Sequence, residues 1–283
     1  MKMLNKISVV ATMLATMITS QAQAQTITVK GSDTMVILAQ KWAEVYMDKN
    51  PTIKIQVTGG GSGVGLAALQ HGQIDIANSS RPIKPTEIEN CVKTFGKRPR
   101  TYKVAVDGLS VYVNNSNSVT ELTMEQLQGI FTGKIKNWKE LGGKDSSIIV
   151  YSRENSSGTY EFFKEHVLKG KDFVASAQTM QGTAALLQAV TKDINAIGYG
   201  GAAYGGSAQV VGVKKDSTTP AILPTEITVI NATYPIWRYL YIYLNPDNDK
   251  GEIANYINWL RSDKGQLIVK EIGYYPLPKQ LRE

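Results

Sequence analysis

The sequence predicts an α/β protein of two domains, in which the first domain is formed by two separate chain segments. Strand and helix patterns alternate as β-α-β-α-β over residues 26–81, which is typical of a parallel sheet with helices on its faces. Two long β-rich runs, residues 103–114 and 235–245, enclose a central block with helices and strands of its own. We therefore expect two crossing strands that act as a hinge, with a cleft between the domains.

The first strands of the predicted sheet end in glycine or polar residues. Residues 26–31 alternate apolar and polar side chains, and residues 53–58 form a second strand. A helix is expected after each strand, over residues 34–48 and 64–71, where apolar residues recur at helical spacing. A third short strand ends in the polar residues 78–81. Ligands of such sheets bind beyond the carboxyl ends of the strands, so we expect a site at this edge.

The central block and the C-terminal tail continue the mixed pattern of helices and strands. Helices are expected where apolar residues recur every three to four positions, and strands where β-branched and aromatic residues gather. The helices expected in these parts are residues 123–130, 137–143, 159–168, 251–261 and 264–272, and the strands lie within residues 147–155 and 194–206.

Residues 1–24 have the pattern of a cleavable secretory signal. Lys2 and Lys6 provide a positive start, residues 7–18 are apolar, and a small-residue cleavage site ends at Ala24. The apolar stretch is too short to span a bilayer, and no cysteine follows it that could carry a lipid anchor. The sequence therefore predicts a soluble protein that is released into the periplasm.

The remaining 259 residues, 283 minus 24, are enough for two domains with separate cores. We expect the first domain to comprise residues 25–113 and 236–283, and the second to comprise residues 114–235. Cys91 is the single cysteine, so no disulfide can form within the chain and the cores must provide the stability.

The charge of the chain favours an anionic ligand without indicating nucleic acid. The formal net charge is +7, and it falls to +5 when the two lysines of residues 1–24 are removed. Lys and Arg do not form a long basic run with interleaved aromatic residues, and residues 93–100 are the one dense basic segment. A solvated loop or a partner contact explains a segment of this size better than a nucleic-acid interface does.

Three segments have the composition of anion-binding helix openings. They are GSDTM at residues 31–35, GGGSG at residues 59–63 and RENSSGT at residues 153–159. Free backbone N–H groups and the positive end of the helix dipole attract an anion, and serine or threonine hydroxyls add donors with little bulk. Three such openings, one with an arginine, predict a pocket for a small tetrahedral oxyanion.

Each of these segments also has a plainer interpretation. The GGGSG loop alone is more often a tight turn before a helix, and no lysine follows it as in a nucleotide-binding loop. Arg81 fits a role as a loop or hinge brace better than one as a ligand contact, and Asp107 fits a turn or cap. Arg153 differs, because the hydroxyls and the helix opening around it provide a site for an anion.

The sequence shows no catalytic or metal-binding constellation. His71 and His166 do not have the spacing of metal ligands, and Val64 replaces the last glycine of a nucleophile elbow. A secreted phosphate-ester hydrolase with Ser62 or Ser157 as nucleophile is the alternative from another class, but no histidine or metal cluster is available to activate either serine. We therefore expect a binding protein that is not an enzyme and needs no cofactor or metal.

Several motifs together resemble the periplasmic substrate-binding proteins of phosphate ABC transporters. They are KGSDTM, QVTGGGSGVGLAAL, DIANSSRPI, IFTGKIKNWKEL and YSRENSSGTYEFF, in the order of the family, and YPIWRYLYIYLN extends the similarity towards the C-terminus. The resemblance implies a type II periplasmic-binding fold that captures inorganic phosphate between its domains. It also implies a monomer that delivers phosphate to a permease whose transmembrane and ATPase subunits are other chains.

The resemblance also implies which residues hold the ligand. The expected phosphate-binding residues are Ser32, Asp33, Thr34, Ser62, Ser80, Arg153, Asn155, Ser157, Gly158 and Thr159. Among them, Arg153 is expected to present its planar fork to two phosphate oxygens.

One position departs from the family pattern. The family usually has a carboxylate two residues after the arginine, which accepts the hydrogen bond of monoprotonated phosphate and excludes sulfate, whereas this chain has Asn155. An amide accepts a hydrogen bond but carries no charge, so we expect Asp33 to take over the acceptor role. Binding of sulfate, molybdate or arsenate, and a role as a phosphate sensor, remain alternatives.

Overall fold

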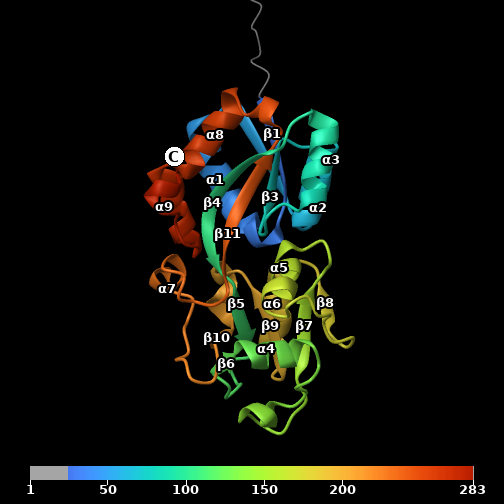
Figure 1. The fold of residues 1–283 in the computed structure, drawn as a ribbon. Coiled ribbons are helices and arrows are strands. Elements are labelled where there is room, and N and C mark those ends of the chain that lie inside the picture. The colour runs from blue at the N-terminus through green and yellow to red at the C-terminus, as the bar shows by residue number, and fades with distance from the viewer. Residues whose placement is uncertain (1–24, 283) are drawn as a thin grey trace, which may run out of the picture.

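The computed structural model describes residues 25–282, so the predicted signal segment and its cleavage site lie outside the described residues. The chain forms two lobes, each built around one sheet, and strands β4 and β11 lead from one lobe to the other (Figure 1). None of the helices within residues 25–282 is long and apolar enough to cross a membrane.

The first sheet has the strand order β2-β1-β3-β11-β4. Its strands are β1 (Gln25–Gly31), β2 (Ile53–Thr58), β3 (Ile76–Ser79), β4 (Arg100–Gly108) and β11 (Trp237–Leu244). The strand β1 pairs in parallel with β2 and β3, which confirms the predicted parallel arrangement. The strand β11 lies between β3 and β4 and is antiparallel to both.

Helices cover both faces of this sheet. They are α1 (Val36–Lys49), α2 (Ser62–Gln70), α3 (Pro85–Phe95), α8 (Gly251–Arg261) and α9 (Asp263–Ile272). One core joins Trp42 of α1, Ile257 of α8 and Val269 of α9 to the sheet, and a smaller core joins Leu66 of α2 to Tyr243 of β11. The order of elements places the carboxyl ends of β1, β2 and β3 towards the second lobe.

The second sheet has the strand order β6-β10-β5-β9-β7-β8. Its strands are β5 (Ser110–Val113), β6 (Glu121–Thr123), β7 (Ile149–Arg153), β8 (Gln178–Met180), β9 (Ala196–Gly200) and β10 (Gln209–Lys214). The sheet is mixed, because β7 is parallel to β8 and β9 whereas β5 is antiparallel to β9 and β10.

Four α-helices accompany this sheet among the described residues: α4 (Met124–Phe131), α5 (Gly158–His166), α6 (Thr183–Lys192) and α7 (Glu226–Ile230). Phe163 of α5 stacks on Tyr199 of β9 at 4.0 Å between ring centroids, and Phe131 of α4 meets Phe163 edge-on. This aromatic packing fixes α5, and therefore its N-terminus, against the sheet.

The chain passes between the lobes at two adjacent points. The N–H group of Leu109 donates to the carbonyl of Ile236 at 2.8 Å, directly after β4 and directly before β11. The expected first domain ends at residue 113, yet Ser110–Val113 pairs within the second sheet as β5. Residues 110–113 therefore share a sheet with strands β9 and β10.

Candidate anion-binding site

The structure brings the three predicted helix openings together where the two lobes meet. Asp33–Met35 forms a 3₁₀ turn before α1, while Ser62 begins α2 and Gly158 begins α5. Thr34 Oγ1 lies 2.6 Å from Thr159 Oγ1, although 125 residues separate them. The sheet edges therefore converge as the strand order predicts.

Four buried hydroxyls form a connected chain across this junction. Ser62 Oγ lies 3.3 Å from Ser80 Oγ, and it also accepts from the N–H group of Ser80 at 3.0 Å. Ser80 Oγ lies 3.5 Å from Thr159 Oγ1, which in turn meets Thr34. A hydroxyl can rotate to donate or accept, so the four groups form an adaptable polar surface for an oxyanion.

The backbone at the start of α5 lies against these hydroxyls. Ser157 is the N-cap of the helix, and its Oγ accepts from the N–H groups of Thr159 and Tyr160 at 3.2 and 3.3 Å. A Cβ atom on Gly158 would lie 2.3 Å from Ser62 Oγ and 2.8 Å from Ser80 Oγ. A glycine at this position therefore lets the two walls of the site touch.

The GGGSG loop and the loop before α5 make direct contact, so the structure is a closed one. The N–H group of Gly63 donates to the carbonyl of Ser156 at 2.9 Å, and Ser156 Oγ donates to the carbonyl of Gly60 at 3.1 Å. Gly61 has a φ of +96°, and a side chain there would meet the Ser156 carbonyl. Closure thus depends on backbone that only glycine adopts readily.

Arg153 reaches the junction from the end of β7 and is 2% exposed. Its Nε and Nη2 atoms donate to the carboxylate of Glu154 at 2.9 and 2.7 Å, and Nη2 also donates to Asp33 Oδ2 at 3.0 Å. Nη1 donates to Thr183 Oγ1 at 2.8 Å. Four of the five N–H groups of the guanidinium are thereby used, and one on Nη1 remains for a ligand.

Both carboxylates around Arg153 accept hydrogen bonds from its guanidinium. Burial raises the pKa of Glu154, but the hydrogen bonds and charge of Arg153 outweigh burial and bring this pKa below its usual value. Asp33 accepts from Arg153 with Oδ2 and from the N–H group of Gly60 with Oδ1, at 3.0 and 2.8 Å. Both oxygens of Asp33 therefore already accept a hydrogen bond within the protein.

Asn155 lies apart from the buried hydroxyls of this site and is exposed. The N–H group of Ser157 donates to the carbonyl of Glu154 at 2.9 Å and closes a tight turn. Asn155 lies at the tip of this turn and is exposed, next to Tyr160 and Lys164. The side chain two residues after Arg153 therefore points away from the hydroxyls.

Arg81 acts as a brace, as the plainer interpretation of its sequence predicts. Its Nη1 and Nη2 atoms donate to the Glu87 carboxylate at 2.8 and 2.7 Å, and its Nε atom lies 2.8 Å from Glu161 of α5. Lys84 pairs with the same Glu161 oxygen at 2.7 Å. These ion pairs connect the first lobe to α5 of the second.

The structure adds an arginine that the sequence analysis did not identify. Arg238 of β11 lies opposite Asp107 of β4, and both are almost fully buried. Nε and Nη2 of Arg238 donate to Asp107 Oδ2 at 2.9 and 2.8 Å, and Nη2 also donates to Thr159 Oγ1 at 3.0 Å. Asp107 thus pairs with a cation, and its Oδ1 atom also accepts from the N–H group of Ala202, which begins a 3₁₀ turn. The sequence does contain a signal for Arg238, because an arginine is unusual within an apolar run such as residues 235–245.

Three buried polar atoms around the junction have no hydrogen-bond partner among the described residues: Ser32 Oγ, Asn78 Oδ1 and Arg238 Nη1. The N–H group of Ser32 donates to the Asn78 carbonyl at 2.9 Å, so these two residues are neighbours. Unpaired buried polar groups are rare in proteins, since each costs about 1–3 kcal/mol. Their presence beside the hydroxyls is what a site for a polar ligand requires.

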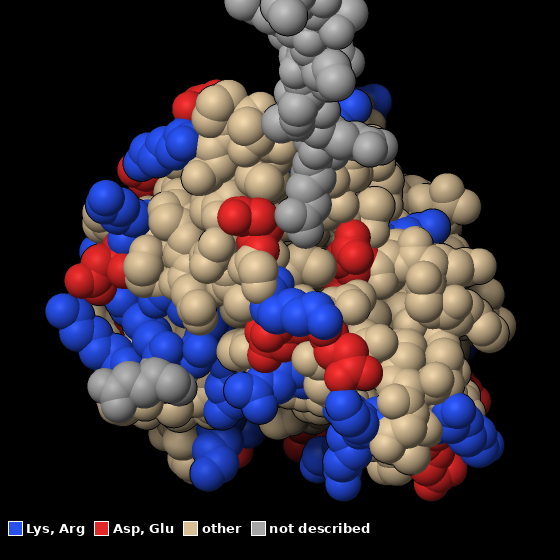
Figure 2. Space-filling view, turned by 90° about the horizontal axis from the view of Figure 1, so that it is seen from above, with Lys and Arg blue, Asp and Glu red and all other residues tan. Residues whose placement is uncertain are grey.

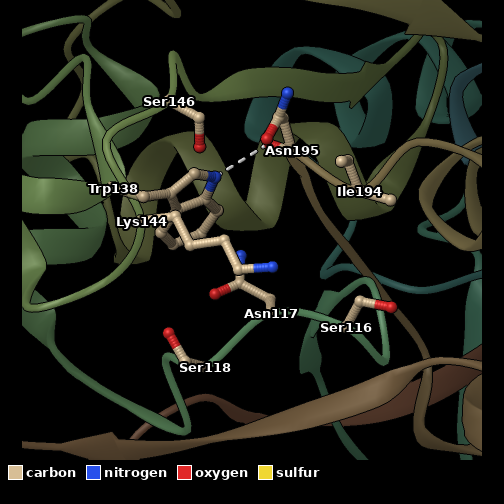
Figure 3. A pocket seen from close by; sticks show the side chains of 8 residues that line it. All are labelled: Ser116, Asn117, Ser118, Trp138, Lys144, Ser146, Ile194 and Asn195. Atoms are coloured by element: carbon tan, nitrogen blue, oxygen red, sulfur yellow. Dashed lines mark hydrogen bonds between the residues drawn. The ribbon is translucent and has the colours of Figure 1, made fainter.

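A small pocket elsewhere in the second lobe is unsuited to a ligand. It is lined by Trp138 and its neighbours, and the indole N–H group of Trp138 donates to the carbonyl of Asn195 at 3.0 Å (Figure 3). Its volume of about 20 Å³ is room for a single water molecule. The junction of the helix openings is therefore the stronger candidate.

Curated proteins resemble this chain over most of its length. A family model described as a PBP superfamily domain matches residues 18–264. The phosphate-binding protein PstS of Pseudomonas aeruginosa is 32% identical over 269 residues, which cover 89% of this chain and 83% of that protein. PstS of Bacillus subtilis is 34% identical over 252 residues and covers 89% and 80%.

Solved structures resemble the fold as well. A substrate-binding protein of a phosphate ABC transporter from Clostridium perfringens, with bound phosphate, matches at a TM-score of 0.82 with 29% identity, covering 90% of this chain and 100% of that one. An ABC-type phosphate transport receptor from Vibrio cholerae matches at a TM-score of 0.71 with 30% identity, covering 89% and 100%. The α/β architecture of two sheets is thus shared with these proteins.

Proposed function

The chain belongs to the family of PstS phosphate-binding proteins within the PBP superfamily, and on that premise we propose that it captures inorganic phosphate between its two lobes. Members of this family are substrate-binding proteins of transporters and not enzymes. The proposed site comprises the hydroxyls of Ser32, Thr34, Ser62, Ser80 and Thr159, the start of α5 and the guanidinium of Arg153.

The convergence of the helix openings is the observation that carries this proposal. Thr34, Ser80 and Thr159 come from three separate segments, yet Thr159 Oγ1 lies 2.6 Å from the hydroxyl of Thr34 and 3.5 Å from that of Ser80. The positive end of the α5 dipole points at the same place, because Gly158 begins that helix. A tetrahedral anion can accept from several such donors at once, whereas a planar or elongated ligand would need a wider site.

The carboxylates of the site bear on the choice between phosphate and sulfate. Asp33, Glu154 and Asp107 all accept hydrogen bonds from arginine or from backbone N–H groups. Asp33 can still accept the proton of hydrogen phosphate with a second lone pair, and we retain it as the proposed acceptor. Sulfate, molybdate and arsenate remain the alternatives that a weaker acceptor would admit.

We further propose that the protein acts outside the cytoplasm as a monomer and delivers phosphate to an ABC permease. The secretory pattern of residues 1–24 and the names of the relatives support this proposal. In Figure 2, Lys and Arg side chains lie among Asp and Glu side chains on the outer end of the first lobe. Two members of the basic segment, Lys97 and Arg100, pair with Asp247 and Asp249. This mixture of charges does not resemble a nucleic-acid surface.

Titration calorimetry on the mature protein, freed of bound ligand, tests the proposal with phosphate and sulfate in parallel. We expect phosphate to bind with a dissociation constant of about 1 µM or tighter, which corresponds to about 8 kcal/mol, and sulfate to give no heat. Arg153→Lys, which loses the planar fork, is expected to bind phosphate more weakly. Comparable binding of sulfate would assign the protein to another oxyanion, and no binding of phosphate would refute the proposal.

A further inference from the structure

Arg238 has donors that the protein itself leaves unused. The residue is 3% exposed, and its Nη1 atom has no hydrogen-bond partner among the described residues. The other two nitrogens donate to Asp107 and Thr159. A buried guanidinium nitrogen without an acceptor is costly, and an anionic oxygen is the acceptor that suits it best.

The position of Arg238 places this nitrogen beside the hydroxyl chain. The same guanidinium donates to Thr159 Oγ1, and that oxygen lies 2.6 Å from Thr34 Oγ1 and 3.5 Å from Ser80 Oγ. Because Thr159 accepts from Arg238, its own hydroxyl hydrogen is available for donation to another group. Arg238 thus orients one donor of the site while it presents another.

Asp107 is the partner that holds the buried guanidinium of Arg238 in position. Its Oδ2 atom accepts twice from Arg238, and its Oδ1 atom accepts from the N–H group of Ala202 at 3.0 Å. The pair lies where β4 and β11 pass between the lobes, and Phe162 of α5 covers the guanidinium at 5.3 Å from the ring centroid. The side chain is therefore fixed before any ligand arrives, which lowers the entropic cost of binding.

We propose that Arg238 is a second ligand-binding arginine of this site and donates through Nη1 to the tetrahedral oxyanion. The inference rests on the proposed function, because it assigns a residue of the same phosphate site. Arg153 approaches from β7 in the second lobe, whereas Arg238 approaches from the crossing strand β11. The oxyanion would accordingly receive a cationic donor from each of two separate elements.

Arg238→Lys provides the first test, since lysine keeps the charge opposite Asp107 but loses Nη1. Arg100→Lys is the matched control, because Arg100 also lies on a strand of the first sheet and pairs with an aspartate, Asp249, at 3.1 Å. We expect the dissociation constant for phosphate to rise at least about ten-fold in Arg238→Lys and to stay unchanged in Arg100→Lys. Equal affinity of Arg238→Lys and the wild type would overturn the inference.

A spectroscopic measurement separates direct contact from a merely structural role. We expect the ³¹P resonance of bound phosphate to move in Arg238→Lys and to keep its wild-type position in Arg100→Lys. Weakened binding with an unmoved resonance would show that Arg238 acts only on the fold and would overturn the inference. If Arg238→Lys fails to fold, the double variant Asp107→Asn with Arg238→Gln removes both charges of this buried pair and replaces it in both measurements. Failure of the wild type to bind phosphate would instead refute the proposed function.

Discussion

Gly158 lies where the hydroxyls of Ser62 and Ser80 meet the second lobe. Since an added Cβ atom would come within 2.3 Å of Ser62 Oγ, we expect Gly158→Ala to hold the lobes apart and to weaken phosphate binding about ten-fold or more. Gly206→Ala is the control, because a Cβ atom there meets nothing within 4 Å. Calorimetry of both variants checks the prediction, and equal affinities would contradict it.

At the scale of the elements, we expect Ser157, the N-cap of α5, both to stabilise this helix and to support phosphate binding. Ser157 Oγ accepts from two N–H groups of the first turn, and the same turn faces the proposed ligand. We expect Ser157→Ala to lower the free energy of unfolding by about 1 kcal/mol and also to weaken phosphate binding. Thr123 caps α4 away from the site, so Thr123→Ala should lower stability alone. Denaturant unfolding and calorimetry together measure both effects, and loss of stability without loss of affinity in Ser157→Ala would count against the site.

Glu87 lies in the first turn of α3, and we expect its ion pair with Arg81 to make the free energy of unfolding depend on pH. Burial raises the pKa of Glu87, but the hydrogen bonds and charge of Arg81 outweigh burial and lower this pKa overall. A lowered pKa in the folded state stabilises the protein above the pKa of the unfolded chain, and this stability is lost as the pH falls through the folded value. We expect unfolding between about pH 5 and pH 3 to depend less steeply on pH in Glu87→Gln. Identical pH profiles for the variant and the wild type would contradict the assignment.

At the scale of the elements, the sequence predicts the parts whose patterns are local. The β-α-β-α-β order and the polar strand ends both appear in the structure, because hydrophobic period and glycine placement are readable along the chain. The helices α3, α6 and α7 were not predicted. Cys91 is the single buried residue of α3, so this helix has little apolar periodicity from which it could be predicted. In α6, by contrast, Leu186, Leu187 and Val190 have helical spacing that the sequence analysis did not use.

The parts of the site that escaped prediction depend on pairing between distant segments. Asp107 and Arg238 are 131 residues apart and meet only through the register of β4 and β11. Nothing local distinguishes Asp107 from an aspartate in a turn. Asn155 was placed by its distance from Arg153 along the chain, whereas a tight turn carries it outward.

At the scale of the whole molecule, we expect the ion pairs of Glu161 to stabilise the closed arrangement of the two lobes. Arg81 and Lys84 of the first lobe both reach this carboxylate of α5, at 2.8 and 2.7 Å. We expect Glu161→Gln to favour an open form, with a larger radius of gyration in X-ray scattering and faster release of phosphate. Asp145→Asn removes an exposed pair with Lys139 within the second lobe and should change neither quantity. A closed, wild-type profile for Glu161→Gln would show that the pair does not hold the lobes together.

The place of β11 in the first sheet has a consequence for the order in which the chain folds during synthesis. The strand β11 lies between β3 and β4, but its residues, Trp237–Leu244, are made after the whole second lobe. On the ribosome, β4 must therefore wait for its partner while residues 109–236 emerge and fold. The lobe that begins the chain is accordingly the last to be completed, and its exposed strand edges in the meantime are surfaces for a chaperone to protect.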